Sequence, residues 1–470
     1  MSEGVATHRK HIPAPVLAAI GVAAAFILAI VVIEILGNAS ARRWQRYSAR
    51  LRSTGLPLTF EEIEAQRLSV PEELNGARII ENLIPDLETL GAGGRPYDQQ
   101  RKLLIFGFPE ADFFRGIPKY TLETSRQFIL QHTALLEKLE TLRDRPTGRF
   151  KIEFAVHPHE TLLPHTRPVR IAARLMDLHA VLDLTEGDTE AAARTVFWQH
   201  RLAATLNDEP FLISRLVQIS IDNLAVQRLE QILRVGELDA PTLLRLDDTL
   251  AQRLNTTTMR WAWLGERACL IALFGGVAAG TISTSAVFGV PVLPDAVVLE
   301  NQMHCVEMIT WLVEADGPRE MLAAARRIDT GLRRSDNTIS PTHILAQKAM
   351  WNPHRAVILH QRSMASLRCA RVAVAAERHR LRTDRLPESI DFLVPEFLDA
   401  IPEDPFTGEP LRFVQTEDGI VIYAVDENLE DDGGSVVERE GAQRPADVGF
   451  RLFKPERRGI LLTDEPLPED

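Results

Sequence analysis

One short loop holds the residue types that a zinc hydrolase needs. The stretch HPHETLLPH places His157, His159 and His165, together with Glu160, within nine residues. Imidazole nitrogens and carboxylate oxygens are ordinary zinc ligands, and a zinc ion held by three protein groups can activate a water molecule. The sequence therefore leaves open a metal-dependent hydrolase that uses this loop.

The rest of the sequence gives this chemistry little support. Pro158 and Pro164 set backbone directions that are unrelated to a tetrahedral site, and the HExxH helix of many metalloproteases is missing. The chain also has no GxSxG elbow, no Walker-type phosphate loop and no GxGxxG between a strand and a helix. We therefore predict no catalytic residues, no enzymatic activity and no small-molecule substrate.

Composition and charge narrow the class of protein. A chain of 470 residues can hold two or three domains, and its 45% of hydrophobic and 25% of charged residues are typical of a folded globular protein. The net charge of −12 argues against a nucleic-acid partner, because binding to phosphates requires a basic surface. The three cysteines, Cys269, Cys305 and Cys369, are far apart, which indicates buried thiols and neither disulfides nor a zinc site.

The strongest signal in the sequence is an apolar run near the amino terminus. Residues 12–33 contain no charge, and a helix of about 20 residues covers the hydrocarbon core of a bilayer. The run is longer than the apolar part of a signal peptide, about 7 to 15 residues. We therefore expect a tail at 1–11 and a single uncleaved membrane anchor at 12–36, with Trp44 and Tyr47 near the membrane surface.

A second uncharged run covers residues 268–293 and is also long enough to span a membrane. Its glycines and the TISTS cluster weaken the apolar signal after one good helical stretch. This pattern favours a buried helix followed by a loop.

Helices should fill the chain between the anchor and the carboxy-terminal region. Thr59 and Glu62 have the spacing of a capping box at the start of a helix. Apolar residues recur every three or four positions from Ile171 to Leu182 and again in the next two segments, which predicts a helical hairpin and a third helix. A long helix is expected at about 341–383, with Pro353 near its first turns or splitting it.

The carboxy-terminal region changes character after this helix. The short apolar runs LRFV and IVIYAV flank TEDG, in which Asp418 and Gly419 suit a tight turn, so we expect a β-hairpin. The predicted fold class is thus mainly α with a small α+β head. Its expected parts after the anchor are a helical stalk region at 37–150, a solenoid-like helical-hairpin domain at 151–340, and the long helix with the head at 341–470.

This head resembles the carboxy-terminal domain of the major pseudopilins of bacterial type II secretion. The residues that match the family's three motifs are Leu386, Pro387 and Ser389, then Asp404, Pro405, Phe406, Gly408, Pro410 and Leu411, and finally Tyr423, Asp432, Gly433 and Gly434. The stretches RLRSTGLPLTFEEI, GDTEAAARTVFWQHRLAATLNDEPFLISRLVQI and DVGFRLF resemble a group of uncharacterised single-pass membrane proteins of planctomycete-type bacteria.

The resemblance implies a calcium ion in the carboxy loop, the one cofactor that the sequence suggests. Calcium takes six to eight oxygen ligands from a flexible acidic loop. The residues that could supply them are Asp426, Asn428, Asp431 and Asp432. The alternative is that these residues form a solvated turn.

The resemblance also bears on location. It implies a body outside the cytoplasm, although the five arginines that follow the anchor within residues 42–52 favour a cytoplasmic body by the positive-inside rule. We expect a single-pass protein of the bacterial cytoplasmic (inner) membrane with an extracytoplasmic body. We expect it to act without catalysis, in scaffolding or assembly through contacts with partner proteins.

A true pseudopilin subunit remains an alternative, and it would be processed at its amino terminus. Pseudopilins carry a glutamate five residues into the apolar helix, whereas Glu34 lies at the far end of this one.

Overall fold

The structure, a computed structural model, describes residues 14–92, 117–254, 258–335, 344–350, 352–436, 447–459 and 462–463. The predicted tail at 1–11 lies outside these residues, as do the first two residues of the predicted anchor. The described chain is mainly helical and carries one three-stranded antiparallel sheet near its carboxy terminus. The predicted fold class is confirmed at this level.

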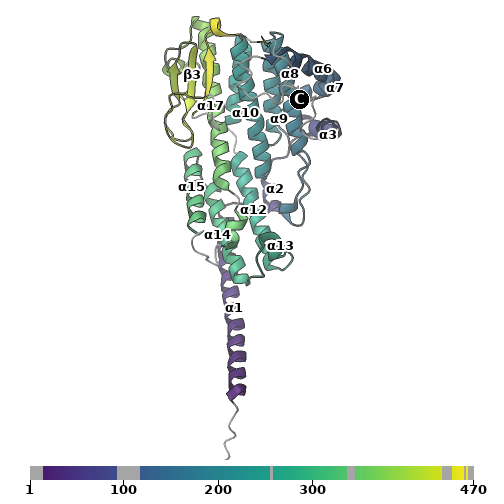
Figure 1. The fold of residues 1–470 in the computed structure, drawn as a ribbon, viewed down its shortest axis with the longest axis vertical. Coiled ribbons are helices and arrows are strands. Elements are labelled where there is room, and N and C mark those ends of the chain that lie inside the picture. The colour runs from purple at the N-terminus through teal and green to yellow at the C-terminus, as the bar shows by residue number, and fades with distance from the viewer. Residues whose placement is uncertain are drawn as a thin grey trace, which may run out of the picture.

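Helix α1, Ala14–Ser53, is one helix of 40 residues. Its first half projects from the body as an isolated rod (Figure 1). The described apolar side chains of this rod are exposed, among them Val22 at 71% and Phe26 at 67%. By length and composition the rod can cross a membrane, which agrees with the anchor predicted at 12–36.

The second half of α1 packs along helix α14, Asp295–Val313. Leu51 of α1 and Val306 of α14 belong to one small apolar cluster, and Trp44 and Tyr47 are half-buried against it. Ser40 donates a hydrogen bond of 2.8 Å to Glu300 of α14. Since no break separates the two halves of α1, the exposed rod is a rigid extension of the body.

Consecutive helices form the centre of the body. They are α8, Thr166–Thr185; α9, Thr189–Ala204; α10, Leu212–Val235; and α11, Ala240–Leu254. The predicted hairpin is α8 and α9, which pack on each other and on α10. Gly187 has a φ of +82° in the turn between them, and Asp188 caps α9 by accepting a hydrogen bond of 2.8 Å from the Ala191 amide.

The preceding segments flank this centre. They are α2, Phe60–Gln66; η1, Glu72–Leu74; α3, Ala77–Ala92; α6, Lys119–Gln131; α7, Thr133–Glu140; η3, Thr141–Asp144; and η4, Pro158–Glu160. The predicted capping box forms, because Thr59 Oγ1 accepts from the Glu62 amide at 3.2 Å. Helices α3, α6 and α7 contact α8. The described residues of the predicted stalk region, 37–150, that follow α1 therefore lie along the side of the body.

The second uncharged run forms the end of helix α12, Thr258–Ala278, and the short helix α13, Thr284–Phe288. Helix α12 packs on α14 and α10, and its Phe274 is fully buried and stacks on Phe288 at 5.7 Å. Although the stretch Ala240–Ala278 is apolar enough for a span, half of its most apolar window is buried. The favoured interpretation, a buried core helix followed by a loop, agrees with this packing.

The predicted long helix is split at Pro353. Helix α15, Pro318–Ser335, is followed by α16, Ile344–Ala349, and by α17, Pro353–Thr383. Asn352 caps α17 by accepting from the Arg355 amide at 3.1 Å, and proline is well suited to the first turn of a helix. Helix α17 runs the length of the upper body beside α10 and α11 (Figure 1).

The head packs its sheet on α17 and α10. The strands are β2, Arg412–Gln415; β3, Gly419–Ala424; and β4, Val448–Phe453. The predicted hairpin pairs β2 with β3 in the register Arg412 with Tyr423, and β4 pairs with the other edge of β3. The remaining short elements are η5, Ile390–Leu393; η6, Pro455–Arg457; and a parallel pair of β1, Ile117–Pro118, and β5, Leu462–Thr463.

One hydrophobic core joins these parts. It extends from Leu56 to Leu452 and includes side chains of the flanking helices, the central helices and the sheet. The predicted segments 37–150, 151–340 and 341–470 therefore share a core, because each buries its apolar face against the others.

Candidate functional site

The motif DPFTGEPL in the head is organised by Asp404, which is fully buried. One carboxylate oxygen accepts the Phe406 amide at 2.8 Å, and the other accepts the Val425 amide at 3.0 Å. Arg412 donates to the same carboxylate at 3.2 Å. Asp404 therefore ties its own turn to the end of strand β3, and its role is to hold the loops of the head in place.

The acidic residues of the carboxy loop are also held by protein partners. Asp426 is 5% exposed and is paired in a two-pronged contact with Arg362 of α17, whose Nε lies 2.8 Å from Oδ1. Asp431 accepts hydrogen bonds of 3.0 Å from Arg412 and from the Tyr423 hydroxyl. Burial and this hydrogen bond raise the pKa of Tyr423 to about 12.

The other two predicted calcium ligands contact each other, since Asn428 Nδ2 lies 3.4 Å from Asp432. The four predicted calcium ligands thus take part in separate contacts: Asp426 with Arg362, Asp431 with Arg412 and Tyr423, and Asn428 with Asp432. Among the described residues, no group of three or more His, Cys, Asp or Glu side chains is placed to hold a metal ion. Ion pairs of Asp426 with Arg362 and of Asp431 with Arg412 hold the acidic loop against α17 and β2.

This network predicts the response to calcium. To bind calcium, Asp426 and Asp431 would have to release their arginines and gather around one ion. We therefore expect that millimolar calcium does not change the unfolding midpoint of the full-length protein in detergent. Magnesium, the control ion, should have no effect either. A rise with calcium alone, abolished by Asp432→Asn, would show that the loop rearranges into the calcium site that the resemblance implies.

The described histidines of the loop HPHETLLPH have different surroundings in the structure. His165 is 3% exposed, its Nε2 lies 3.1 Å from Glu209 Oε2, and its ring stacks on Phe150 with 4.0 Å between centroids. His157 precedes η4 and is half-buried, and the side chain of His159 lies outside the described residues. The structure gives His165 a partner in the core, and a zinc ligand at this position would have to leave Glu209.

A polar network crosses the central helices at Asp222 of α10, which is fully buried. Its carboxylate accepts from Arg253 of α11 at 3.0 and 2.7 Å, and His200 Nδ1 of α9 lies 3.4 Å away. Burial alone would raise the pKa of Asp222, but the charge of Arg253 and the hydrogen bonds from His200 and Arg253 together outweigh burial and lower it. The ion pair thus stays charged inside the bundle.

The network continues to α17. Arg215 of α10 contacts His360 Nδ1 at 3.0 Å. Burial lowers the pKa of Arg215 to about 10, and burial with the nearby Arg215 charge lowers the pKa of His360. His360 is therefore neutral near pH 7 and accepts the hydrogen bond of the guanidinium.

His200 is the described side chain whose setting comes nearest to that of a general base. Asp222 holds its Nδ1, and its buried Nε2 has no hydrogen-bond partner in the protein. It lines a cavity of about 60 Å³ together with Asn207 and Arg253. This volume has room for a few water molecules and is too small for an organic substrate.

A second buried cluster fastens the carboxy-terminal segment. Glu377 of α17 is fully buried and accepts from Arg380 at 2.8 and 3.0 Å and from Arg458 at 2.8 Å on each oxygen. Burial alone would raise the pKa of Glu377, but the hydrogen bonds from Arg458 and Arg380 outweigh it and lower the pKa. Arg458 also donates to the Gly236 carbonyl at 3.0 Å, so the cluster joins α17, α10 and the segment after β4.

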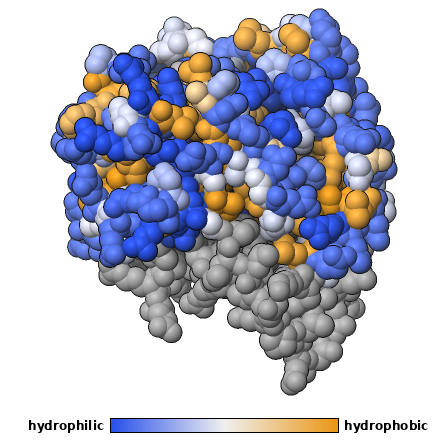
Figure 2. Space-filling view, turned by 90° about the horizontal axis from the view of Figure 1, so that it is seen from above, coloured by the Kyte–Doolittle hydropathy of each residue, from blue (hydrophilic) through white to orange (hydrophobic). Residues whose placement is uncertain are grey.

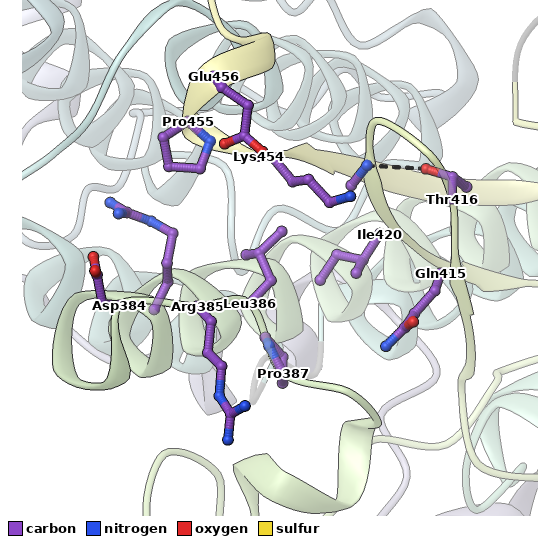
Figure 3. A pocket seen from close by; sticks show the side chains of 12 residues that line it. Asp384, Arg385, Leu386, Pro387, Gln415, Thr416, Ile420, Lys454, Pro455 and Glu456 are labelled. Carbon is purple, nitrogen blue, oxygen red and sulfur yellow. Dashed lines mark hydrogen bonds between the residues drawn. The ribbon is translucent and has the colours of Figure 1, made fainter.

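A cavity of about 320 Å³ lies at the end of α17 (Figure 3). The turn after α17, the β2–β3 hairpin and η6 enclose it, and both signs of charge line it, with Arg385 and Lys454 near Asp384 and Glu456. Ligand pockets usually have mostly apolar walls. This mixed lining suits a polar segment of another molecule better than a small apolar ligand.

Among the residues that the structure describes, the cysteines have no partners for covalent or metal chemistry. All three are free; Cys305 and Cys369 are buried and Cys269 is half-buried. Burial raises the pKa of Cys269 to about 12 and also raises the pKa of Cys305 and Cys369. The predicted buried thiols are confirmed for Cys305 and Cys369.

Asp222 and Glu377 were not predicted as functional residues, although the sequence around both carries a signal. Asp222 shares a helix face with Val226 and Leu229, and Glu377 shares one with Ala373 and Val374. A charged residue on an apolar face indicates a buried partner, because an unpaired buried charge is very unfavourable.

Comparisons with protein-family models, with curated proteins and with solved structures found no match.

Proposed function

We propose that this protein is a single-pass protein of the bacterial inner membrane that acts without catalysis, as a scaffold for other envelope proteins. The observation that carries the proposal is α1, whose apolar half is exposed and projects from a body with a buried core of its own. Exposed apolar surface of this extent in water would be very unfavourable. A bilayer is the surrounding that removes that cost.

The pairing of the charged residues supports the proposed role as a scaffold. Asp426, Asp431 and Glu377, which have the chemistry of ligands or bases, are each paired with arginines that join separate elements. Such pairs fix the geometry of a body and leave those carboxylates little freedom for catalysis. We propose that partner proteins contact the end opposite α1, where the mixed-charge cavity lies.

Membrane fractionation tests the anchor. We expect full-length protein in the membrane pellet after alkaline washing and its release by detergent, because residues 12–36 are held in the bilayer. A variant that lacks residues 2–36 should be recovered in the soluble fraction. Full-length protein that is soluble without detergent would contradict the proposal.

The intact mass of the membrane-bound protein decides between the proposal and two processed forms. We expect a chain that begins at Met1 or Ser2. A mass that corresponds to a start beyond residue 36 would identify a cleaved signal peptide. Removal of a short leader with methylation of the new amino terminus would identify a pseudopilin subunit.

We propose that the body lies outside the cytoplasm, in line with the resemblance of the head to pseudopilins. An alkaline phosphatase fused after Asp470 should then be active, and a β-galactosidase fused at the same place should be inactive. The reverse pattern would follow the arginines after the anchor and move the scaffold to the cytoplasmic face.

A further inference from the structure

We propose that the end of the body next to the α1 rod rests on the lipid bilayer. The contact is made by residues 289–294, GVPVLP, which join α13 to α14 and are called the base loop here. This inference rests on the proposed anchoring by α1. It adds a second contact with the same bilayer.

The base loop is apolar and exposed. Val292 is 88% exposed, Val290 and Leu293 are partly exposed, and Pro291 and Pro294 are exposed. Residues 268–294 contain no charged side chain, although 25% of the residues in the chain are charged. The opposite end of the body is covered mainly by hydrophilic residues, with scattered apolar ones (Figure 2).

The contacts between α1 and α14 set the height of the base loop relative to the rod. The two helices run parallel, because Ser40 contacts Glu300 near the start of α14 and Leu51 clusters with Val306 further along. Asp295 is five residues before Glu300, and thus about 7.5 Å nearer the rod. The start of α14 is therefore level with about residue 35 of α1, at the end of the predicted anchor.

Helix α12 approaches the same level from the opposite direction. Its Arg267 donates to Thr310 of α14 at 3.1 Å, and its Ile271 packs on the cluster that contains Val306. Helix α12 is thus antiparallel to α14 and ends, at Ala278, near the height of Glu300. Val292 is three residues from Asp295 and hence within about 11 Å of it, so it lies near the height at which the rod leaves the bilayer.

Arginines of α1 lie above this level. Arg42 and Arg46 of α1 are exposed, and Arg43 pairs with Glu300. Arg42 is six residues beyond Leu36, which corresponds to about 9 Å along the helix. Arginines at this height can contact lipid phosphates while apolar residues below them enter the acyl boundary. The continuity of the base loop with the rod identifies the bilayer as its occupant.

Fluorescence quenching by lipid tests this contact. The full-length chain carries Cys269→Ala, so that the two remaining native cysteines are buried, and one new cysteine for a polarity-sensitive label. The test variant is Val292→Cys, the positive control is Phe26→Cys in the rod, and the negative control is Leu381→Cys near the far end of α17, where Leu381 is 40% exposed. The proteins are placed in vesicles of phosphatidylethanolamine and phosphatidylglycerol that contain nitroxide lipids, labelled near the headgroup to reach the base loop and along the acyl chain to reach Phe26→Cys.

We expect the label at Val292→Cys to be quenched several-fold more than the label at Leu381→Cys, and Phe26→Cys to be quenched as well. Quenching at Phe26→Cys with none at Val292→Cys would overturn the base contact and leave the anchor intact. If aqueous iodide also fails to reach Val292→Cys in that case, protein covers the base loop. Absence of quenching at Phe26→Cys would overturn the anchor itself. Circular dichroism confirms that each variant is folded, and the exposure of Val292 makes its replacement mild.

Discussion

Glu377→Gln is expected to unfold at a clearly lower denaturant concentration than the wild-type protein, with a loss of about 3–5 kcal/mol in the free energy of unfolding. The substitution preserves the size of the side chain and removes its charge. Arg458 and Arg380 are 3% and 7% exposed at their side chains and would lose the carboxylate that both of them contact. Arg458 then lacks this counter-charge, and Arg380 is left with Glu237, whose side chain is 52% exposed; this accounts for the size of the loss.

The dependence on pH has a definite sign. Because the folded state lowers the pKa of Glu377, the carboxylate stabilises the fold above its unfolded pKa of about 4.3. This stabilisation is lost as the pH falls through the lower folded pKa. The difference between wild type and Glu377→Gln should therefore be largest at neutral pH and shrink in acid.

The matched control is Glu388→Gln, which removes a carboxylate that is 66% exposed and lies 3.6 Å from Arg385. An exposed pair of this kind contributes little. Unfolding is measured by circular dichroism on full-length protein in detergent micelles. Equal stability of Glu377→Gln and Glu388→Gln would show that the carboxy-terminal segment is not held by this cluster.

Asp222→Asn should also cost about 3–5 kcal/mol in the free energy of unfolding. The Arg253 side chain is 5% exposed and also donates to Asn207 at 2.7 Å, but its two hydrogen bonds to Asp222 bring the negative charge that offsets its burial between α10 and α11. An amide can accept one of these hydrogen bonds but supplies no charge. Because the pKa of Asp222 is lowered in the folded state, this loss should also fade below about pH 4.

The double variant Asp222→Asn with Arg253→Met separates the ion pair from simple misfolding. The double variant removes both charges of this pair, so that Arg253 is no longer left buried without Asp222, and we expect it to be more stable than Asp222→Asn alone. Asp144→Asn, at a side chain that is 73% exposed, serves as the surface control. A double variant that is less stable than either single variant would mean that the polar network is needed for packing and not only for charge balance.

The parts of the fold that depend on local sequence could be predicted. The spacing of Leu175, Leu178 and Leu182 defined α8, Thr59 with Glu62 defined the start of α2, and Asp418 with Gly419 defined the hairpin of the head. Each of these patterns acts over a few residues, through helix periodicity, capping or turn geometry. For the same reason the apolar helix α1 was the clearest prediction.

The contacts that decide the role of the charged residues could not be predicted in this way. Asp426 pairs with an arginine 64 residues away, and Glu377 pairs with Arg458 at a separation of 81 residues. An acidic loop with two glycines fits calcium ligands and arginine partners equally well until the packing of α17 against the head is known. The hydrophobic core that these segments share also depends on contacts between residues far apart in the sequence.

Because α1 is one uninterrupted helix, its length sets the distance between the bilayer and the body. One residue inserted between Leu36 and Ser40 would turn the embedded stretch by about 100° and lift the body by about 1.5 Å. Four inserted residues would nearly restore the rotational phase but raise the body by about 6 Å. Since α1 is one continuous helix from Ala14 to Ser53, the rotation and the height of the body relative to the bilayer depend on the number of residues in that connection.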